Sequence, residues 1–206
     1  MQISLSDTGK RFNREWIFRK LSYQFNQGAS YAITGPNGSG KSTLLQVIAG
    51  AVANSEGLVE YKNENVIIDP EKAFRHISIA APYQELIEEL TLVEFLEFHA
   101  RFKPFLSIIG IHEIIQHIGL ESASKKQIRY YSSGMKQRVK LAQAIFSQTS
   151  CVLLDEPCTN LDEDGIALYH RLIEHYCAER LVIVSSNDPQ EYGFCKNIVS
   201  ILHYKK

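Results

Sequence analysis

The 206-residue chain has few of the features that mark several classes of protein. It has four widely spaced cysteines and no C-x-x-C pair, which argues against a zinc site or a disulfide framework. Its formal net charge is −1 with no dense block of lysine and arginine, so no nucleic-acid partner is expected. No apolar run approaches the roughly 18 residues that a membrane-spanning helix needs. The N-terminus also lacks the pattern of a secretory signal, so we expect a cytoplasmic protein that meets a membrane only through a partner.

Short apolar runs rich in β-branched residues alternate with helical patterns, as in a largely parallel α/β sheet. The predicted core strands are Ser30–Thr34, Cys151–Leu154, Leu181–Val184 and Ile198–Leu202. Residues 1–30 and 55–80 are more typical of antiparallel β structure, with Gly28 and Gly57 as turn signals. Residues 30–50 and 135–206 are then left to form the core of the domain.

Between these parts, residues 85–134 have the pattern of a mainly helical insert. Thr91 and Glu94 form a capping-box pattern ahead of apolar residues at helical spacing, among them Phe95 and Leu96. A second helix is predicted from the i, i+3, i+4, i+7 series Ile111, Ile114, Ile115 and Ile118. Gly119 stands where a left-handed C-terminal cap would lie.

Residues 35–42, with the sequence GPNGSGKS, match the phosphate-loop pattern G-x-x-x-x-G-K-[ST]. They lie between the strand SYAIT and a helix that begins near Lys41, which is the context that the pattern requires. Glycines let backbone N–H groups converge on phosphate oxygens, and the helix N-terminus adds partial positive charge. Lys41 is expected to reach the β- and γ-phosphates, and the Ser42 hydroxyl to ligate Mg²⁺. A chance glycine-rich turn is the weaker alternative.

A second chemical signal follows the predicted strand Cys151–Leu154, which leads directly into Asp155 and Glu156. Ligands bind at this edge of open α/β sheets. We expect Asp155 to hold Mg²⁺ through water and Glu156 to act as general base on the attacking water. Strands often end in acidic turn residues, but beside a phosphate loop the pair indicates nucleotide hydrolysis.

Residues 131–135, YSSGM, resemble the LSGGQ signature of the ATP-binding cassette (ABC) family, and KQRVKLAQAI follows where the family has a similar helix. The amides near Ser133 and the Ser132 hydroxyl can hold a γ-phosphate. The resemblance covers nearly the full chain and implies one domain over residues 1–206. That domain has an α/β P-loop NTPase (RecA-like) core, an antiparallel β subdomain and a small inserted α-helical subdomain. It also implies a head-to-tail dimer that sandwiches ATP. Taken alone, YSSGM could be a polar helix start on a solvated face.

Other family positions are carried over one at a time. Gln84 resembles the Q-loop glutamine, which implies contact with Mg²⁺ or water; an exposed loop glutamine is the alternative. Asp162 resembles the D-loop aspartate, although an acidic helix cap explains it equally. Phe12 resembles the aromatic that stacks on adenine, with Trp16 as a rival. The residues expected to bind nucleotide are Phe12, Gly35, Pro36, Asn37, Gly38, Ser39, Gly40, Lys41, Ser42, Thr43, Ser132, Ser133, Gly134 and Asp162. The expected metal ligands are Ser42, Gln84 and Asp155, and the expected catalytic residues are Glu156, Gln84 and Asn187.

Two positions depart from the family pattern. Asn187 stands where the family usually has the switch histidine. An amide can still donate a hydrogen bond to a γ-phosphate, but it does not titrate, so we expect slower yet measurable hydrolysis. In the signature, Ser133 replaces a glycine and Met135 a glutamine, which resembles bacterial exporter cassettes with separately encoded membrane subunits.

The leading interpretation is a transport ATPase that uses ATP and Mg²⁺ and pairs with a second cassette and a separate transmembrane permease. It would lie on the inner face of the cell membrane, and we expect it to power export of a substrate. Two alternatives stay open: a soluble ABC ATPase that acts on ribosomes or DNA, and a regulatory subunit with little catalysis.

Overall fold

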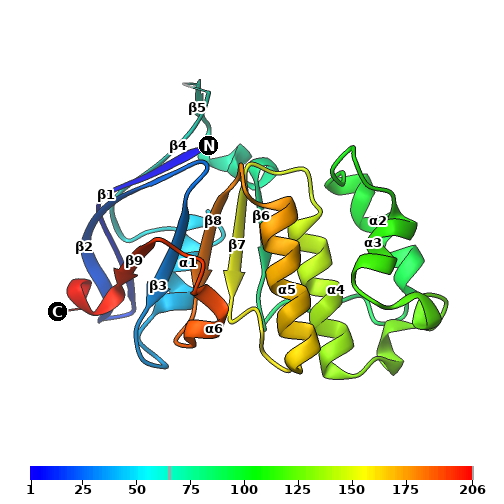
Figure 1. Cartoon of the computed structure of the whole chain (residues 1–206). Coiled ribbons are helices and arrows are strands. Elements are labelled where there is room, and N and C mark those ends of the chain that lie inside the picture. Colours follow the sequence, from blue (N-terminus) through cyan, green and yellow to red (C-terminus); the bar gives the residue numbers. More distant parts are fainter. Residues whose placement is uncertain (65, 206) are drawn as a thin grey trace.

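A five-stranded parallel sheet runs through the centre of the computed structural model, which describes residues 1–64 and 66–205 (Figure 1). Every neighbouring pair of its strands is parallel. The loops that follow β3, β7 and β8 therefore leave the sheet at one edge. Its strand order is β6 (Ile77–Ala80), β7 (Cys151–Asp155), β8 (Leu181–Ser185), β3 (Ser30–Thr34) and β9 (Asn197–Ser200).

Strands β7 and β8 are buried at every position. Successive side chains point to opposite faces of a strand, so a strand covered on both sides is apolar throughout. Leu153 and Ile183 belong to the core on one face of the sheet, whereas Leu154 and Val184 belong to the core on the other. The prediction of buried strands from short apolar runs is confirmed here.

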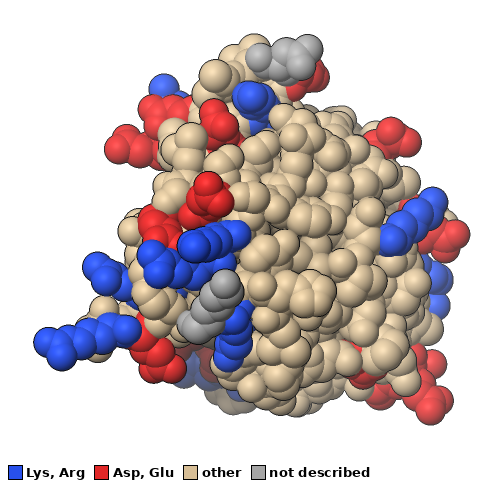
Figure 2. Space-filling model, turned by 90° about the vertical axis from the view of Figure 1, so that its left-hand side faces the viewer, with Lys and Arg blue, Asp and Glu red and all other residues tan. Residues whose placement is uncertain are grey.

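An antiparallel sheet and helix α1 (Lys41–Ile48) cover the first face. The antiparallel strands lie in the order β2 (Glu15–Asn26), β1 (Gln2–Phe12), β4 (Glu56–Asn63) and β5 (Val66–Ile68). Basic and acidic side chains are interspersed on this side of the molecule (Figure 2). Arg19 pairs with Glu56 at 2.8 and 3.0 Å and so joins β2 to β4 across β1.

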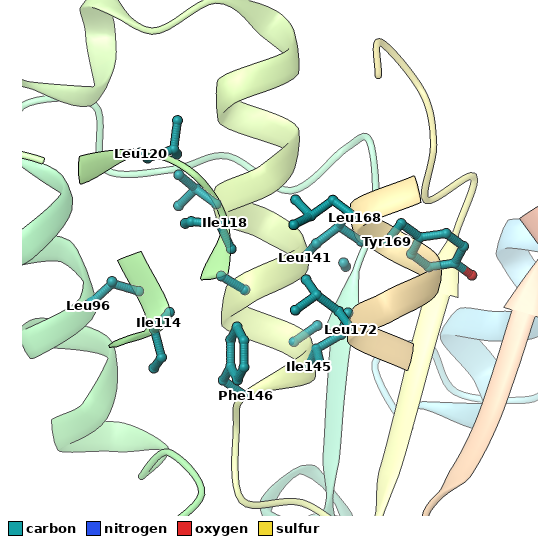
Figure 3. Close-up of a cluster of buried hydrophobic side chains, with 14 of the residues drawn as sticks. Leu96, Ile114, Ile118, Leu120, Leu141, Ile145, Phe146, Leu168, Tyr169 and Leu172 are labelled. Carbon is teal, nitrogen blue, oxygen red and sulfur yellow. The ribbon is translucent and has the colours of Figure 1, made fainter. Parts of the chain in front are cut away.

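Helices α4 (Ser133–Ile145) and α5 (Glu163–Tyr176) cover the second face. The insert, with α2 (Leu92–Phe102) and α3 (Ile111–His117), lies beyond them, at the opposite end of the molecule from the antiparallel sheet (Figure 1). Figure 3 shows how one cluster joins these elements: Leu96 and Ile114 from the insert, Leu141 from α4 and Leu172 from α5. The core is continuous from the sheet to the insert, which holds α4 firmly between them.

Local signals predicted the helix boundaries in the insert. The Thr91 hydroxyl accepts a hydrogen bond from the Glu94 amide at 3.3 Å, and the Glu94 carboxylate accepts one from the Thr91 amide at 2.8 Å. This reciprocal pair is the predicted capping box. Gly119, at φ +67°, has the left-handed conformation expected after α3.

Two predicted strand assignments need correction. Residues 77–80 were placed with the antiparallel part (55–80), but they form β6, which pairs in parallel with β7. The strand predicted over Ile198–Leu202 is β9, which covers Asn197–Ser200 and is followed by a 3₁₀ turn. β9 pairs with β3, which ends at Thr34 where the chain turns into the phosphate loop, so residues beyond Ser200 have no strand to pair with.

The four cysteines are free thiols, and Cys151, Cys158 and Cys177 are buried. Burial raises the pKa of Cys151 and of Cys158 to about 12, which makes them poor nucleophiles and poor metal ligands. Within residues 1–64 and 66–205, no helix has both the length and the apolar character needed to cross a membrane.

Candidate functional site

The phosphate loop connects the end of β3 to the start of α1, as the sequence predicts. Gly40 has φ +99°, and a Cβ atom there would lie 2.3 Å from Cγ2 of Ile17, so the position accepts only glycine. Lys41 is buried, and its ammonium donates to the Gly35 carbonyl oxygen at 2.9 Å. The loop borders a hollow of about 250 Å³ lined by Ile17, Asn37, Gly38, Ser39, Gly40, Lys41, Ser42, Thr43 and Glu156. Amides at a helix N-terminus around such a hollow suit a phosphate chain.

Three buried oxygens at this edge of the sheet have no hydrogen-bond partner among the described residues: Ser39 Oγ, Asp155 Oδ1 and Ser185 Oγ. Asp155 is only 2% exposed, and it is paired directly with Ser185 in the register of β7 and β8. A buried carboxylate oxygen without a donor is costly unless a cation or a donor completes it. Mg²⁺ binds through one or two protein oxygens together with waters and substrate phosphates, and Asp155 with Ser42 is a donor set of that kind.

Glu156 lies next to Asp155 in a strained backbone conformation, with φ +44°. Its amide donates to the Ser185 carbonyl oxygen at 2.9 Å, which ties the turn to β8, while its side chain lines the phosphate-loop hollow. Positive φ in a residue other than glycine costs free energy and clusters at functional sites. The turn therefore aims a carboxylate at the space where a terminal phosphate would lie.

Asn187 also lies beside this hollow. The chain leaves β8 through Ser186, and the Asn187 side-chain amide donates to Asn37 Oδ1 at 2.9 Å. Asp188 then caps the short helix α6 (Pro189–Tyr192) by accepting from the Gln190 amide at 2.9 Å. The predicted switch residue is thus in direct contact with the phosphate loop.

Gln84 lies elsewhere. Its side-chain oxygen accepts a hydrogen bond from the Ala81 amide at 3.0 Å, and it lines a second hollow of about 520 Å³ between the loop after β6 and helix α4. Ser133 and Lys136 line the same hollow. Among the described residues that line the two hollows, Gln84 belongs to this one and not to the one at the phosphate loop, where Ser42 lies, so its role as a metal ligand stays a prediction.

The signature residues form the predicted helix start. Ser132 is the N-cap of α4, and its hydroxyl accepts from the Met135 amide at 3.3 Å. Gly134 packs so closely that a Cβ atom there would lie 2.9 Å from the Asn160 carbonyl oxygen. Asp162 caps α5 and borders the same hollow of about 440 Å³ as Ser132–Gly134. Within the part of the chain that the structure describes, no residue lines both this hollow and the one at the phosphate loop.

The Asp162 carboxylate accepts hydrogen bonds from two described residues. Its Oδ1 atom accepts from the Gly165 amide at 2.8 Å and from the Arg138 guanidinium at 3.2 Å. The Gly165 hydrogen bond first, and then the nearby Arg138 charge, lower the pKa of Asp162. Both interpretations of Asp162, helix cap and border of the signature site, are therefore compatible with its position.

The two candidate aromatics differ in their surroundings. The Trp16 ring has the Arg19 guanidinium 4.4 Å and the Arg11 guanidinium 5.5 Å from its centroid. Phe12, at the end of β1, is 49% exposed with the Lys10 ammonium 4.8 Å from its centroid. Phe12 thus offers more free ring surface, although it does not line the hollow of the phosphate loop. Ile17, which does line it, was missed because an isoleucine in a strand carries no sequence signal for nucleotide binding.

Residues 18–159 match the family described as ABC transporter. The chain belongs to this family. This cassette is 28% identical to the uncharacterized ABC transporter ATP-binding protein YybJ of Bacillus subtilis, over 98% of the chain and 93% of YybJ. It is 30% identical to the bacitracin transport ATP-binding protein BcrA of Bacillus licheniformis, over 99% of the chain and 67% of BcrA.

Solved structures share the fold of the cassette. A putative ABC transporter ATP-binding protein from Pyrococcus furiosus superimposes with a TM-score of 0.83 at 21% identity, with both chains fully covered. The dimeric cassette MJ0796 gives 0.81 at 23% identity, over 96% of this chain and 93% of that one. The expected α/β P-loop NTPase fold is confirmed. As a member of this family, the chain is an ATP-binding and ATP-hydrolysing subunit of an ABC transporter.

Proposed function

We propose that residues 1–206 act as one ABC ATPase domain that binds Mg-ATP between two head-to-tail copies. The observation that supports this most is that the phosphate loop and the turn Ser132–Gly134 border different hollows of one chain. Each site offers a helix N-terminus, so each suits phosphate oxygens but encloses the nucleotide on one side only. A second copy, turned head to tail, would supply the missing side. MJ0796, whose fold this chain shares, has been solved as a dimer.

Within that dimer the roles follow from chemistry and position. Lys41 and the loop amides would hold the β- and γ-phosphates, and Ser42 directly and Asp155 through water would hold Mg²⁺, which would neutralise charge on the phosphates. Glu156 takes a proton from the attacking water, and Asn187 donates to the γ-phosphate. Phe12 stacks on the adenine. Gln84 lines the other hollow in this structure. It would therefore reach the Mg²⁺ site only if the loop that follows β6 moves.

The partner that we propose is a separate transmembrane permease, which places the cassette on the cytoplasmic face of the membrane. Exposed aromatic rings support a docking surface near the insert. The ring centroids of Phe98 and Phe102 in α2 lie 5.0 Å apart, and Phe102 is 74% exposed. Phe74 is also exposed, and its carbonyl oxygen accepts from Lys103 at 3.0 Å, which places it beside the end of α2. Exposed apolar patches mark interaction sites. Export is the proposed direction, because Ser133 and Met135 in the signature resemble bacterial exporter cassettes. Relatives are named for bacitracin and lantibiotic transport.

The experiment that tests the proposal uses Glu156→Gln, which keeps the shape of the side chain but cannot accept a proton. We expect this variant to run as a monomer in EDTA and as a dimer in Mg-ATP, measured by light scattering after size exclusion. Its rate of phosphate release should fall by about 10²- to 10⁴-fold. Glu163→Gln, an exposed acid in the first turn of α5, is the matched control and should keep the wild-type rate.

Two results would contradict the proposal. A Glu156→Gln variant that stays monomeric in Mg-ATP at high protein concentration would remove the head-to-tail sandwich. Wild-type phosphate release no faster than that of Glu156→Gln would remove the general base. The latter result would favour the second candidate, a regulatory subunit with little catalysis. The observation that favours this candidate is Asn187 at the position where the family usually has a histidine.

A further inference from the structure

Two lysines of α4 hold the segment that carries Gln84. Lys136 and Lys140 are one helical turn apart and so lie on one face of the helix. The Lys140 ammonium donates to the Pro82 carbonyl oxygen at 2.9 Å and lies 3.4 Å from that of Ala81. The Lys136 ammonium pairs with Glu88 at 2.6 Å. The loop is thus bound to the signature helix on both sides of Gln84.

The contacts of Lys136 and Lys140 differ from those of lysines on a solvent-exposed helix face, whose ammonium groups are surrounded by water. Like charges four residues apart on a helix repel each other, so the pair is not there to stabilise α4 by itself. Burial lowers the pKa of Lys140, and the Lys136 charge lowers it further, so its ammonium gives up water to reach the two carbonyl oxygens. Hydrogen bonds from a charged donor are the stronger kind and offset that loss.

The same first turns of α4 contact two more segments of the site. Gln137 is buried and donates to the Pro157 carbonyl oxygen at 2.7 Å, one residue after Glu156. Arg138 pairs with Asp162. The helix that presents Ser132–Gly134 at its N-terminus therefore touches the Gln84 loop, the turn after Glu156 and the cap of α5 within one chain.

We propose that Lys136 and Lys140 are positioning residues that couple the Gln84 loop to the signature turn. If the Gln84 loop moves toward a bound nucleotide, the two ammonium groups would move α4 with the loop and set the angle at which Ser132–Gly134 meets the second copy. This inference rests on the proposed head-to-tail dimer and deepens it, since it names what aligns the two halves of each site.

The test combines Lys140→Met, which keeps the length of the stem, with Lys140→Arg and Lys136→Gln. Lys126→Met, at an exposed position of the same insert, is the matched control. In the Glu156→Gln background, the protein concentration for half-maximal Mg-ATP dimerisation should rise about 2- to 30-fold for Lys140→Met, with a similar fall in the kcat of the active enzyme. Binding of a fluorescent ATP analogue to dilute monomer and the melting temperature should be unchanged. Lys140→Arg should restore most of the loss.

The outcomes separate this inference from the proposed function. Suppose that Glu156→Gln dimerises, and that the Lys140→Met and Lys136→Gln variants also dimerise and hydrolyse ATP normally. This result would overturn the coupling but leave the proposed dimer unaffected. A loss that follows a lower melting temperature and weaker monomer binding would also overturn it, because the lysines would then be structural. Failure of Glu156→Gln itself to dimerise would remove the proposed function and this inference with it.

Discussion

The side-chain amide of Asn187 donates a 2.9 Å hydrogen bond to Oδ1 of Asn37, which joins the loop after β8 to the phosphate loop. An asparagine amide has two N–H donors, and Asn37 takes one of them. The second has no partner among residues 1–64 and 66–205, so it can meet a terminal phosphate in the hollow that Asn37 lines. A non-titrating residue can in this way occupy the place of the family's histidine.

Replacing Asn187 tests this role. Asn187→Ala should lower kcat about tenfold or more, because a hydrogen bond to a charged group contributes about 1.5–3 kcal/mol. Asn187→His should raise kcat and introduce a step in the pH–rate profile near the histidine pKa, which the wild type should lack. Phosphate release measured from pH 5.5 to 8.5 checks both, with Gln190→Ala as the control. Equal rates for the wild type and Asn187→Ala would show that the amide contributes nothing.

Asp155→Asn should separate stability from metal binding. Removal of a buried charge that has an unpartnered oxygen should raise the melting temperature of the metal-free protein by about 2–4 °C, equivalent to about 1 kcal/mol for a domain of this size. The Mg²⁺ concentration for half-maximal activity should rise about 10- to 100-fold, as for other ligands that act through a bound water. Thermal melts in EDTA and Mg²⁺ titrations measure the two effects, with Asp164→Asn as the control. A less stable protein with unchanged Mg²⁺ dependence would make Asp155 a structural residue.

Phe12→Ala should weaken ATP binding about 5- to 100-fold, because stacking of a base on an aromatic ring contributes about 1–3 kcal/mol. Phe12→Tyr should keep wild-type affinity, since the ring face is retained. Phe102→Ala removes a more exposed ring, at the end of helix α2 in the insert, and serves as the control. The Kd for a fluorescent ATP analogue measures the effect. A larger loss for Trp16→Ala than for Phe12→Ala would assign the base to Trp16.

His99 predicts a pH-dependent stability. Burial lowers the pKa of His99 to about 4, and the neighbouring Lys103 charge adds to this. The Ser147 hydroxyl donates to the Gln143 carbonyl oxygen at 2.6 Å, which leaves the Ser147 oxygen to accept from His99 Nε2 at 2.9 Å. The lowered pKa keeps the ring neutral at pH 7. Because the unfolded chain binds the proton more readily, this contribution to stability is lost as pH falls from about 6.5 toward 4.

We expect the wild type to lose about 1 kcal/mol more than His99→Gln in the free energy of unfolding between pH 7 and pH 5, after allowance for solvent screening. Urea unfolding at the two pH values measures the difference. Equal losses in the two proteins would show that His99 does not carry the effect. His117, which pairs with the hydroxyl of Tyr176 near the surface, offers a control substitution to glutamine.

Several features could be predicted because they depend on neighbouring residues in the chain. The capping box of Thr91 and Glu94, the N-cap at Ser132 and the strand that ends at Asp155 each arise from local spacing and hydrophobic pattern. The phosphate loop is similar, because its glycines and the following helix lie within a few residues of each other. The family resemblance added roles for residues that are common in loops, such as Gln84.

Other features depend on partners far away in the chain. Strand β6 resembles any short apolar run, and only its pairing with β7, more than 70 residues later, places it in the parallel sheet. The end of β9 is decided by where β3 ends, and the Asn187 contact by a residue 150 positions away. The hollow that Gln84 lines is formed together with residues of helix α4. Local sequence thus determined which groups can bind phosphate and metal. Tertiary packing decided which of them face one hollow, because hydrogen-bond partners and side-chain directions depend on segments that meet only in the folded chain.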